Sequence, residues 1–228
     1  MRITGGVLRG RRISAPRGLQ VRPTTDRVRE SMFQIAWTRF GQPKEGAVVL
    51  DLFAGSGILG LEALSRGADR SVFVDRSRIA LNSVLKNSAI LGDEKQIFLI
   101  LKNISGGERC FRFFCDLKNR FGEFHLIFMD PPYGKGFIEP VCQGICDSGI
   151  LAPEGVVIAE AGARELLPPS FVSEAVTHSE GDNHMPNRSL CISDERIYGQ
   201  TRLFFLTRCS GNHRTRLDGK GQRASSTI

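Results

Sequence analysis

The sequence predicts an α/β protein built on a largely parallel β-sheet, and three observations carry this prediction. Short strand-like segments alternate with helical segments from residue 47 to residue 159. The strand-like segments are apolar almost throughout, as strands are when helices cover both faces of a sheet. A glycine-rich turn of the form G-x-G-x-x-G joins the first of these strands to a helix at Gly55, Gly57 and Gly60.

The first 40 residues predict a small extension of hairpin and helix. Residues 1–23 are rich in glycine and arginine, and the short β-like segments 2–4 and 11–14 suggest a hairpin. Thr24 or Thr25 is a suitable N-cap for a helix that ends at residues 40–43. We therefore assign residues 1–40 to an N-terminal extension and residues 41–207 to the main domain.

Hydrophobic periodicity predicts the remaining elements in chain order. The expected strands are residues 47–50, 71–74, 97–101, 124–129, 156–159 and 201–206. The expected helices are residues 58–66, 77–91, 108–120 and 137–147. Residues 179–198 are polar and hard to assign, and residues 208–228 are expected to form a basic, disordered tail.

Composition excludes several classes of protein. No apolar run approaches the roughly 20 residues of a membrane-spanning helix, and the basic N-terminus lacks the apolar core of a secretory signal. The six cysteines form no C-x-x-C pair, and no histidine lies near them at zinc-site spacing. We therefore expect six reduced thiols, no metal, no membrane partner and a cytoplasmic location.

Positive charge is concentrated at the two ends of the chain. The net charge is +7; residues 1–40 contain nine arginines and two acids, a net of +7, whereas residues 41–207 have a net charge of −4 and residues 208–228 one of +4. Because a guanidinium binds phosphate through paired hydrogen bonds, the arginine-rich start favours a polyanionic partner such as a nucleic acid. A merely solvated, solubilising surface is the alternative.

Four polar signals fall where parallel strands end. Asp51 and the glycine turn follow the first strand, Asp75 the second, Asn103 the third, and the sequence Asp-Pro-Pro-Tyr the fourth, at residues 130–133. Ligands of open α/β sheets bind at the carboxyl ends of the strands, so these residues predict one shared site.

Asp51 decides which ligand the glycine turn takes. Asp75 lies 75 − 55 = 20 residues beyond Gly55, the spacing of a dinucleotide-binding fingerprint. A carboxylate at Asp51, however, would oppose a pyrophosphate. S-adenosylmethionine has no phosphate and carries an ammonium and a sulfonium group, so an acid suits it. Asp75 can then accept hydrogen bonds from the ribose hydroxyls.

The four residues Asp130, Pro131, Pro132 and Tyr133 suit methyl transfer to an exocyclic amine. The Asp130 carboxylate and the Pro131 carbonyl can accept hydrogen bonds from the amine and direct its lone pair at the methyl group. The two prolines stiffen the loop, and the ring of Tyr133 can stack on a flat base. This chemistry needs orientation and electrostatics, with no metal and no covalent nucleophile.

The chain resembles the RsmD-type 16S ribosomal RNA guanine-N2 methyltransferases over residues 1–206. The matching stretches are MRITGGVLRGRRI, RPTTDRVRESMF, VLDLFAGSGILGLEALSRGA, VFVDRS, IFMDPPYGKG and RIYGQTRLFF. The resemblance implies a Rossmann-like, seven-stranded class I methyltransferase sheet with an N-terminal RNA-binding extension. It also implies one guanine of the small ribosomal subunit as target; we expect a monomer.

On this resemblance the site residues fall into three groups. The catalytic loop is Asp130, Pro131, Pro132 and Tyr133. The cofactor site comprises Asp51, Phe53, Ala54, Gly55, Ser56, Gly57, Asp75, Arg76 and Asn103. The RNA-binding arginines are Arg9, Arg11, Arg12, Arg22 and Arg27. Asn103 departs from the family, which usually has an acid there, so its amide oxygen would accept the adenine hydrogen bond without charge.

Three other functions share part of the pattern. A DNA adenine-N6 methyltransferase would share the Asp-Pro-Pro-Tyr loop. A NAD-dependent oxidoreductase would share the glycine turn but would have no use for that loop. A non-catalytic RNA-binding protein would retain the loop as a relic.

Overall fold

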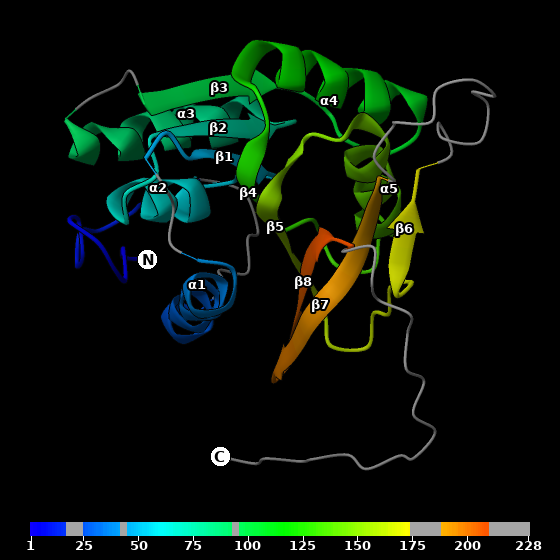
Figure 1. The fold of residues 1–228 in the computed structure, drawn as a ribbon. Helices are drawn as coiled ribbons and strands as arrows, with labels where there is room; N and C mark the ends of the chain where they lie inside the picture. The colour runs from blue at the N-terminus through cyan, green and yellow to red at the C-terminus, as the bar shows by residue number, and fades with distance from the viewer. Residues whose placement is uncertain (17–24, 42–44, 93–95, 174–187, 210–228) are drawn as a thin grey trace.

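The computed structural model describes residues 1–16, 25–41, 45–92, 96–173 and 188–209, which form one eight-stranded sheet flanked by helices (Figure 1). The strands are β1 Val48–Leu52, β2 Arg70–Asp75, β3 Ile97–Leu101, β4 Phe124–Met129, β5 Leu151–Gly162, β6 Ser170–Val172, β7 Ser189–Tyr198 and β8 Thr201–Arg208. The helices are α1 Asp26–Phe40, α2 Ile58–Ser65, α3 Arg78–Ser88, the 3-10 turn η1 Ala89–Leu91, α4 Glu108–Phe121 and α5 Ile138–Ser148.

Four strand pairs of the sheet are parallel and three are antiparallel. Its order is β3-β2-β1-β4-β5-β8-β7-β6; the pairs from β3 to β5 are parallel, and the pairs β5–β8, β8–β7 and β7–β6 are antiparallel. The Rossmann-like architecture is therefore confirmed. The described residues have eight strands where the resemblance implies seven, because the three-residue strand β6 adds to the edge beside β7.

Two apolar layers cover the sheet. One layer joins α4 and α5 to the sheet through residues such as Phe114 and Val141. The opposite layer contains α1, α2 and α3, and the N-terminal segment contributes Ile3 and Ile13 to it. The predicted hairpin is present as a bridge between Arg2 and Arg12. Ile3, Ile13 and the apolar face of α1 thus pack in the same core as α2 and α3.

The predicted elements are found near their expected bounds, although β5 begins at Leu151, five residues before the expected start at residue 156. Residues 189–198 form β7, a strand that the polar sequence did not indicate, and β6 was also not predicted. The predicted N-cap Thr25 accepts a hydrogen bond from the amide of Val28, whereas Thr24 lies outside the described residues. No helix among the described residues is long and apolar enough to cross a membrane.

The expectation of six reduced thiols is wrong for one pair. Cys191 and Cys209 form a disulfide with a Cα–Cα distance of 5.3 Å. The sequence could not show this pair, because it depends on the register of β7 against β8. In that register Cys191 lies opposite Thr207, and the amide of Cys209 donates to the carbonyl of Ser189. The other four cysteines are free, and Cys209 and Arg208 belong to the described fold rather than to the tail.

Candidate active site

The glycine turn after β1 owes its shape to three left-handed residues. Phe53 has φ 62°, Gly55 φ 54° and Gly57 φ 77°. A left-handed phenylalanine is strained, which is common at binding sites. The turn directs the amide of Gly55 at Asp75, whose Oδ2 accepts its hydrogen bond at 2.9 Å. Asp75 Oδ1 also accepts from the amide of Ser77 at 2.8 Å. Asp75 therefore holds the turn in place.

The other two glycines serve packing between helix and strand. A Cβ on Gly60 would lie 2.3 Å from a ring carbon of Phe73, so α2 can approach β2 only with glycine there. A Cβ on Gly57 would lie 3.0 Å from Val84 of α3. Gly60 also donates its amide to Asp51 Oδ2 at 2.9 Å. The motif thus shapes the site mainly through its backbone.

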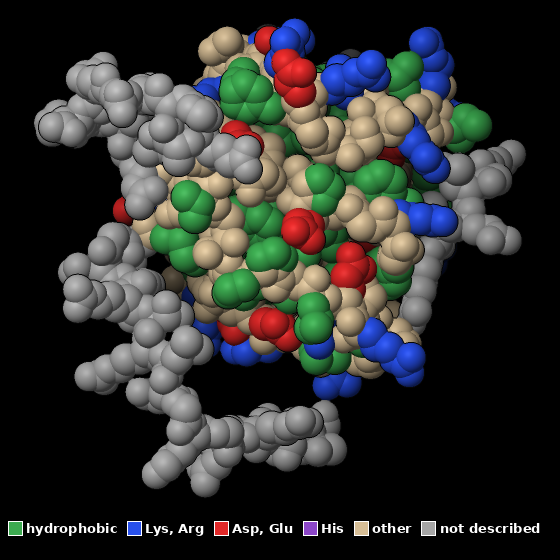
Figure 2. Space-filling model, turned by 90° about the vertical axis from the view of Figure 1, so that its right-hand side faces the viewer, with side chains coloured by type: hydrophobic (Ala, Val, Ile, Leu, Met, Phe, Trp, Pro, Cys, Tyr) green, Lys and Arg blue, Asp and Glu red, His purple; other side chains and the backbone are tan. Residues whose placement is uncertain are grey.

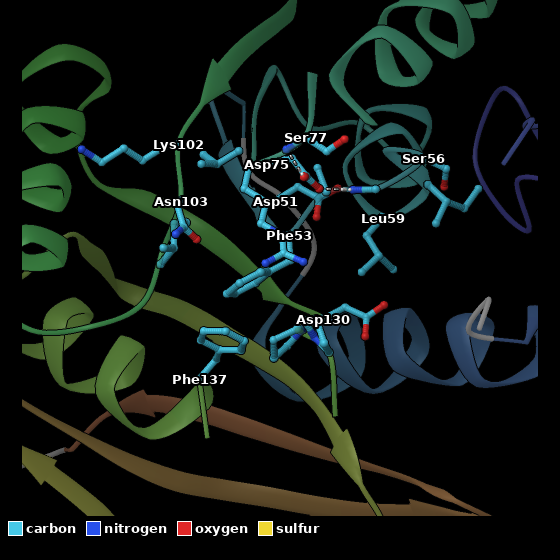
Figure 3. Close-up of a pocket in the computed structure, with 18 of the residues that line it drawn as sticks. Asp51, Phe53, Ser56, Leu59, Asp75, Ser77, Lys102, Asn103, Asp130 and Phe137 are labelled. Atoms are coloured by element: carbon cyan, nitrogen blue, oxygen red, sulfur yellow. Dashed lines mark hydrogen bonds between the residues drawn. The ribbon is translucent and has the colours of Figure 1, made fainter. Parts of the chain in front are cut away.

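A cavity of about 450 Å³ opens beside this turn (Figure 3), within the size range of small-molecule sites. It brings together twelve of the predicted site residues: Asp51, Phe53, Ala54, Gly55, Ser56, Asp75, Arg76, Asn103, Asp130, Pro131, Pro132 and Tyr133. Gly57 does not line it. The carboxyl ends of β1, β2, β3 and β4 therefore form one site, as their polar residues predicted.

Sequence reasoning missed eight lining residues: Met1, Ile58, Leu59, Val74, Ser77, Lys102, Ile104 and Phe137. Most neighbour predicted residues in the chain, and all but Ser77 and Lys102 are apolar, as core positions are. Phe137 lies beside Phe53 in the lining, with ring centroids 5.8 Å apart. Met1 shows that the N-terminal segment reaches the cavity, which no local pattern indicated.

Two carboxylates of the cavity have little exposure: Asp51 is buried and Asp130 is half-buried. Asp51 is 2% exposed; burial, with a smaller contribution from Asp75, raises its pKa to about 8 despite the Gly60 hydrogen bond. Burial likewise raises the pKa of Asp130 well above its ordinary value, and the charges of Glu160 and Asp51 raise it further. In the described chain neither Asp51 nor Asp130 has an arginine or lysine at ion-pair distance. A cationic ligand would stabilise both carboxylates.

The cavity therefore fits S-adenosylmethionine. Asp51 offers negative charge near the turn, as a sulfonium and an ammonium require. Asp75 lies at the end of β2, where an acid can accept hydrogen bonds from ribose hydroxyls. Phe53, Leu59 and Phe137 provide apolar walls for a flat base. Asn103 is exposed at the end of β3 and can accept a hydrogen bond through its amide oxygen.

The Asp-Pro-Pro-Tyr loop extends from β4 to the next strand of the sheet. Asp130 is half-buried at the end of β4, and Pro131 is buried beside it. The Oη of Tyr133 donates to Oε1 of Glu160 on β5 at 2.5 Å and lies 3.3 Å from Oγ1 of Thr201 on β8. Burial and this bond to Glu160 raise the pKa of Tyr133.

The N-terminal arginines divide into two groups. Arg9, Arg11, Arg12 and Arg27 are exposed, and none lines the cavity; Arg22 lies outside the described residues. Arg29 is 0% exposed, and its Nε donates to Oε2 of Glu62 at 2.7 Å. On the face shown in Figure 2, Lys and Arg side chains lie mainly near the edges, while hydrophobic and acidic side chains lie nearer the middle.

Comparisons with known proteins agree with this geometry. The family model described as "Conserved hypothetical protein 95" matches residues 1–185. The Bacillus subtilis protein named "Putative rRNA methyltransferase YlbH" is 35% identical over 79% of this chain and 92% of its own length. "Ribosomal RNA small subunit methyltransferase D" of Escherichia coli is 34% identical over 74% of this chain and 78% of its own length. The solved structure titled "Putative methyltransferase yhhF from Escherichia coli" has a TM-score of 0.64 and 28% identity, and the match covers 91% of this chain and 97% of that one.

Proposed function

The chain belongs to the RsmD-type family of ribosomal RNA methyltransferases, and we propose that it methylates the N2 amine of one guanine in 16S RNA. The methyl donor is S-adenosylmethionine, and the substrate is the RNA of the small ribosomal subunit. The observation that carries the proposal is the place of Asp130. It borders the same cavity as the glycine turn and Asp75, so an amine held by Asp130 lies beside the bound cofactor.

The chemistry of Asp130 favours guanine over adenine. The Watson–Crick edge of guanine presents N1–H and the N2 amine side by side, and both are donors. A carboxylate has two acceptor oxygens and can bind both donors at once. Adenine presents an acceptor at N1 next to its N6 amine, and this acceptor would face the second oxygen without a hydrogen bond. This pattern supports guanine N2 as the target.

Each residue of the Asp-Pro-Pro-Tyr loop has a separate role in the reaction. When bound, S-adenosylmethionine would supply the methyl group, and the amine nitrogen would bond to it as the carbon–sulfur bond breaks. Asp130 and the Pro131 carbonyl accept hydrogen bonds from the amine and orient its lone pair. Tyr133 stacks on the base. The methylated nitrogen must then lose a proton, and the raised pKa of Asp130 makes it a suitable acceptor.

The exposed arginines support an RNA substrate. Arg9, Arg11 and Arg12 lie on the N-terminal loop, whose first residue lines the cavity. Phosphates bound by this loop would therefore lie near the entrance to the site. Arg27 lies at the start of α1, on the same extension. We assign these arginines to the RNA backbone and the cavity to the cofactor and target base.

Methyl transfer to defined substrates tests the proposal. Labelled S-adenosylmethionine is incubated with small ribosomal subunits, with naked 16S RNA and with duplex DNA from the same source, taken from a strain that lacks the enzyme. We expect label in ribosomal RNA, and nuclease digestion with mass spectrometry should identify N2-methylguanosine. Label in the adenines of DNA would instead assign the protein to the adenine-N6 class, and NAD binding without S-adenosylmethionine binding would exclude methyl transfer.

A further inference from the structure

The hydroxyl of Tyr133 is engaged beneath the active site, although base stacking requires only the ring. It donates to Glu160 at 2.5 Å and lies 3.3 Å from the Thr201 hydroxyl. The same tyrosine lines the cavity. Its side chain thus connects the cavity to the antiparallel half of the sheet, which contributes no cavity-lining residue among those described.

The strands β5 and β8 form a seat for this tyrosine, made of Glu160, Gly162 and Thr201. Gly162 pairs with Thr201 and Glu160 pairs with Leu203, so alternation along each strand places Glu160, Gly162 and Thr201 on one face. A Cβ on Gly162 would lie 3.8 Å from Cδ2 of Tyr133. The ring therefore lies over the glycine, with its hydroxyl between the two polar residues.

Glu160 is a buried carboxylate in the largely apolar strand β5. It is 3% exposed, and its neighbours Ala159 and Ala161 are buried apolar residues. Burying a carboxylate among such residues is unfavourable unless it is hydrogen-bonded. The bond from the catalytic loop satisfies part of this requirement. Met129 of β4 pairs with Ala159 of the parallel strand β5. The next residue along each strand, Asp130 and Glu160, therefore lies beside the other.

The loop after Tyr133 has few other restraints. Gly134 has φ 67° and Gly136 φ 65°, and no atom lies within 4 Å of a Cβ built on either glycine. Lys135 between them is exposed. The contact of Tyr133 with its seat is therefore the main side-chain anchor of this part of the loop.

We propose that Glu160 is a positioning residue for methyl transfer: by accepting the Tyr133 hydrogen bond it fixes the ring on which the target base stacks. Thr201 supports the same hydroxyl from β8. The inference rests on the proposed function, because it assumes that Tyr133 stacks on the base. The stretch around Thr201 resembles the closing strand of the family, and on this proposal it helps to position Tyr133 for the reaction.

The test compares variants that differ in the hydrogen bond but little in size. Glu160→Leu removes the acceptor, whereas Glu160→Gln retains an amide oxygen that can accept from Tyr133. We expect single-turnover methyl transfer to small subunits to fall about 10- to 100-fold with Glu160→Leu, because a misplaced reactant loses its alignment. Glu160→Gln should restore most of the rate. Cofactor affinity should stay unchanged in both.

A double-mutant cycle separates positioning from general destabilisation. Tyr133→Phe removes only the hydroxyl and should slow the reaction by a similar factor. The double variant with Glu160→Leu should be no slower than either single variant, since both break one bond. Glu123→Gln is the matched control, because Glu123 is paired with Lys118 and Arg208 at the amino end of β4, away from Asp130 at its carboxyl end. A Tyr133→Phe enzyme with the native rate would overturn the proposal, even if Glu160→Leu failed to fold.

A second readout does not depend on activity. The chain has two tyrosines, so in a Tyr198→Phe background Tyr133 is the only one that titrates by ultraviolet absorbance. Its pKa should lie above the ordinary value of about 10 and fall when Glu160 becomes Leu. An unchanged titration would refute the bond itself. If the native enzyme methylates no RNA but this shift occurs, the proposed function fails while the contact holds.

Discussion

The carboxylate of Glu62 on α2 and the carboxylates of Asp51 and Asp130 at the cavity differ in their partners. Glu62 of α2 is 0% exposed and binds the guanidinium groups of Arg29 and Arg66, each at 2.7 Å. Asp51 is buried and Asp130 half-buried at the cavity, with hydrogen bonds or carboxylates beside them in place of cations. A compensated carboxylate stabilises the fold, whereas an uncompensated one is available to a cationic ligand.

The compensated group ties the N-terminal segment to the domain. Arg29 also donates to Asp26 at 2.9 Å and to the carbonyl of Arg2, and the Thr4 hydroxyl donates to Glu62. The guanidinium of Arg66 stacks on the rings of Phe33 and Trp37. The cluster therefore holds residues 1–13 against α2, the helix that begins at the glycine turn.

Removing one of the two cations that pair with Glu62 should have the largest effect on stability. We expect Arg29→Met to lower the free energy of unfolding by about 3–5 kcal/mol, because it leaves Glu62 buried with one of its two cations. Arg112→Met is the matched control: its pair with Glu108 is exposed and should contribute less than about 1 kcal/mol. Urea unfolding measures both, and equal midpoints would show that the buried pair contributes no more than the exposed one.

For the cavity carboxylates Asp51 and Asp130, which have no paired cation among the described residues, the largest effect should be on the rate of methyl transfer. Asp130→Asn keeps the size but can turn an NH2 group toward the target amine. Losing one charge-assisted acceptor should slow single-turnover methyl transfer by roughly 10²–10³-fold. Cofactor affinity should persist, since the first two strand ends bind the cofactor. Asp69→Asn, at an exposed position away from the cavity, is the control. Near-native turnover of Asp130→Asn would remove Asp130 from the mechanism.

The pH dependence of cofactor binding should reveal Asp51. Its pKa is raised to about 8 in the free protein, and a bound cation favours its ionised form. Affinity for S-adenosylmethionine should therefore rise as pH rises from 6 to about 8, by up to about tenfold per unit, and then level off. Asp51→Asn should flatten this rise. The demethylated product lacks the sulfonium charge and should depend on pH less; equal slopes in calorimetric titrations would contradict this assignment.

Local patterns were sufficient to predict the parallel half of the sheet and the place of the site. Helix α4, for example, was expected at residues 108–120 and spans Glu108–Phe121, because its apolar face has helical periodicity. Strand β7 was not predicted, since many of its side chains are exposed and polar, and its formation depends on pairing with β8. The two strands form a hairpin joined by Gly199 and Gln200, so the glycine before the predicted strand 201–206 was the local signal that could have indicated β7.

The same limit applies to the site. Asp51, Asp75 and Asp130 follow strands and could be placed from the sequence alone. The bond between Tyr133 and Glu160 depends on the position of β5 beside β4, so the sequence indicated a role only for the ring of Tyr133. Charge counting likewise grouped nine arginines together, although Arg29 is buried in an ion pair and Arg9 is exposed.

The smallest expected effect concerns the exposed arginines of the N-terminal segment, which differ from Arg29 in having no buried carboxylate partner in the described part of the chain. If Arg9, Arg11 and Arg12 each neutralise one RNA phosphate, changing all three to Gln should reduce the slope of log affinity against log salt by about 2, at roughly 0.7 per contact with single-stranded RNA. Stability and cofactor affinity should not change, because these side chains make no buried ion pair.

The control removes the same charge from positions that do not line the cavity, by changing Arg70, Arg112 and Arg120 together to Gln. Filter binding of 16S RNA over a salt series measures both triple variants. Equal slopes for the two would mean that the N-terminal arginines act only through net charge, whereas a selective loss would place the RNA backbone on the segment that the Arg29–Glu62 pair holds against α2.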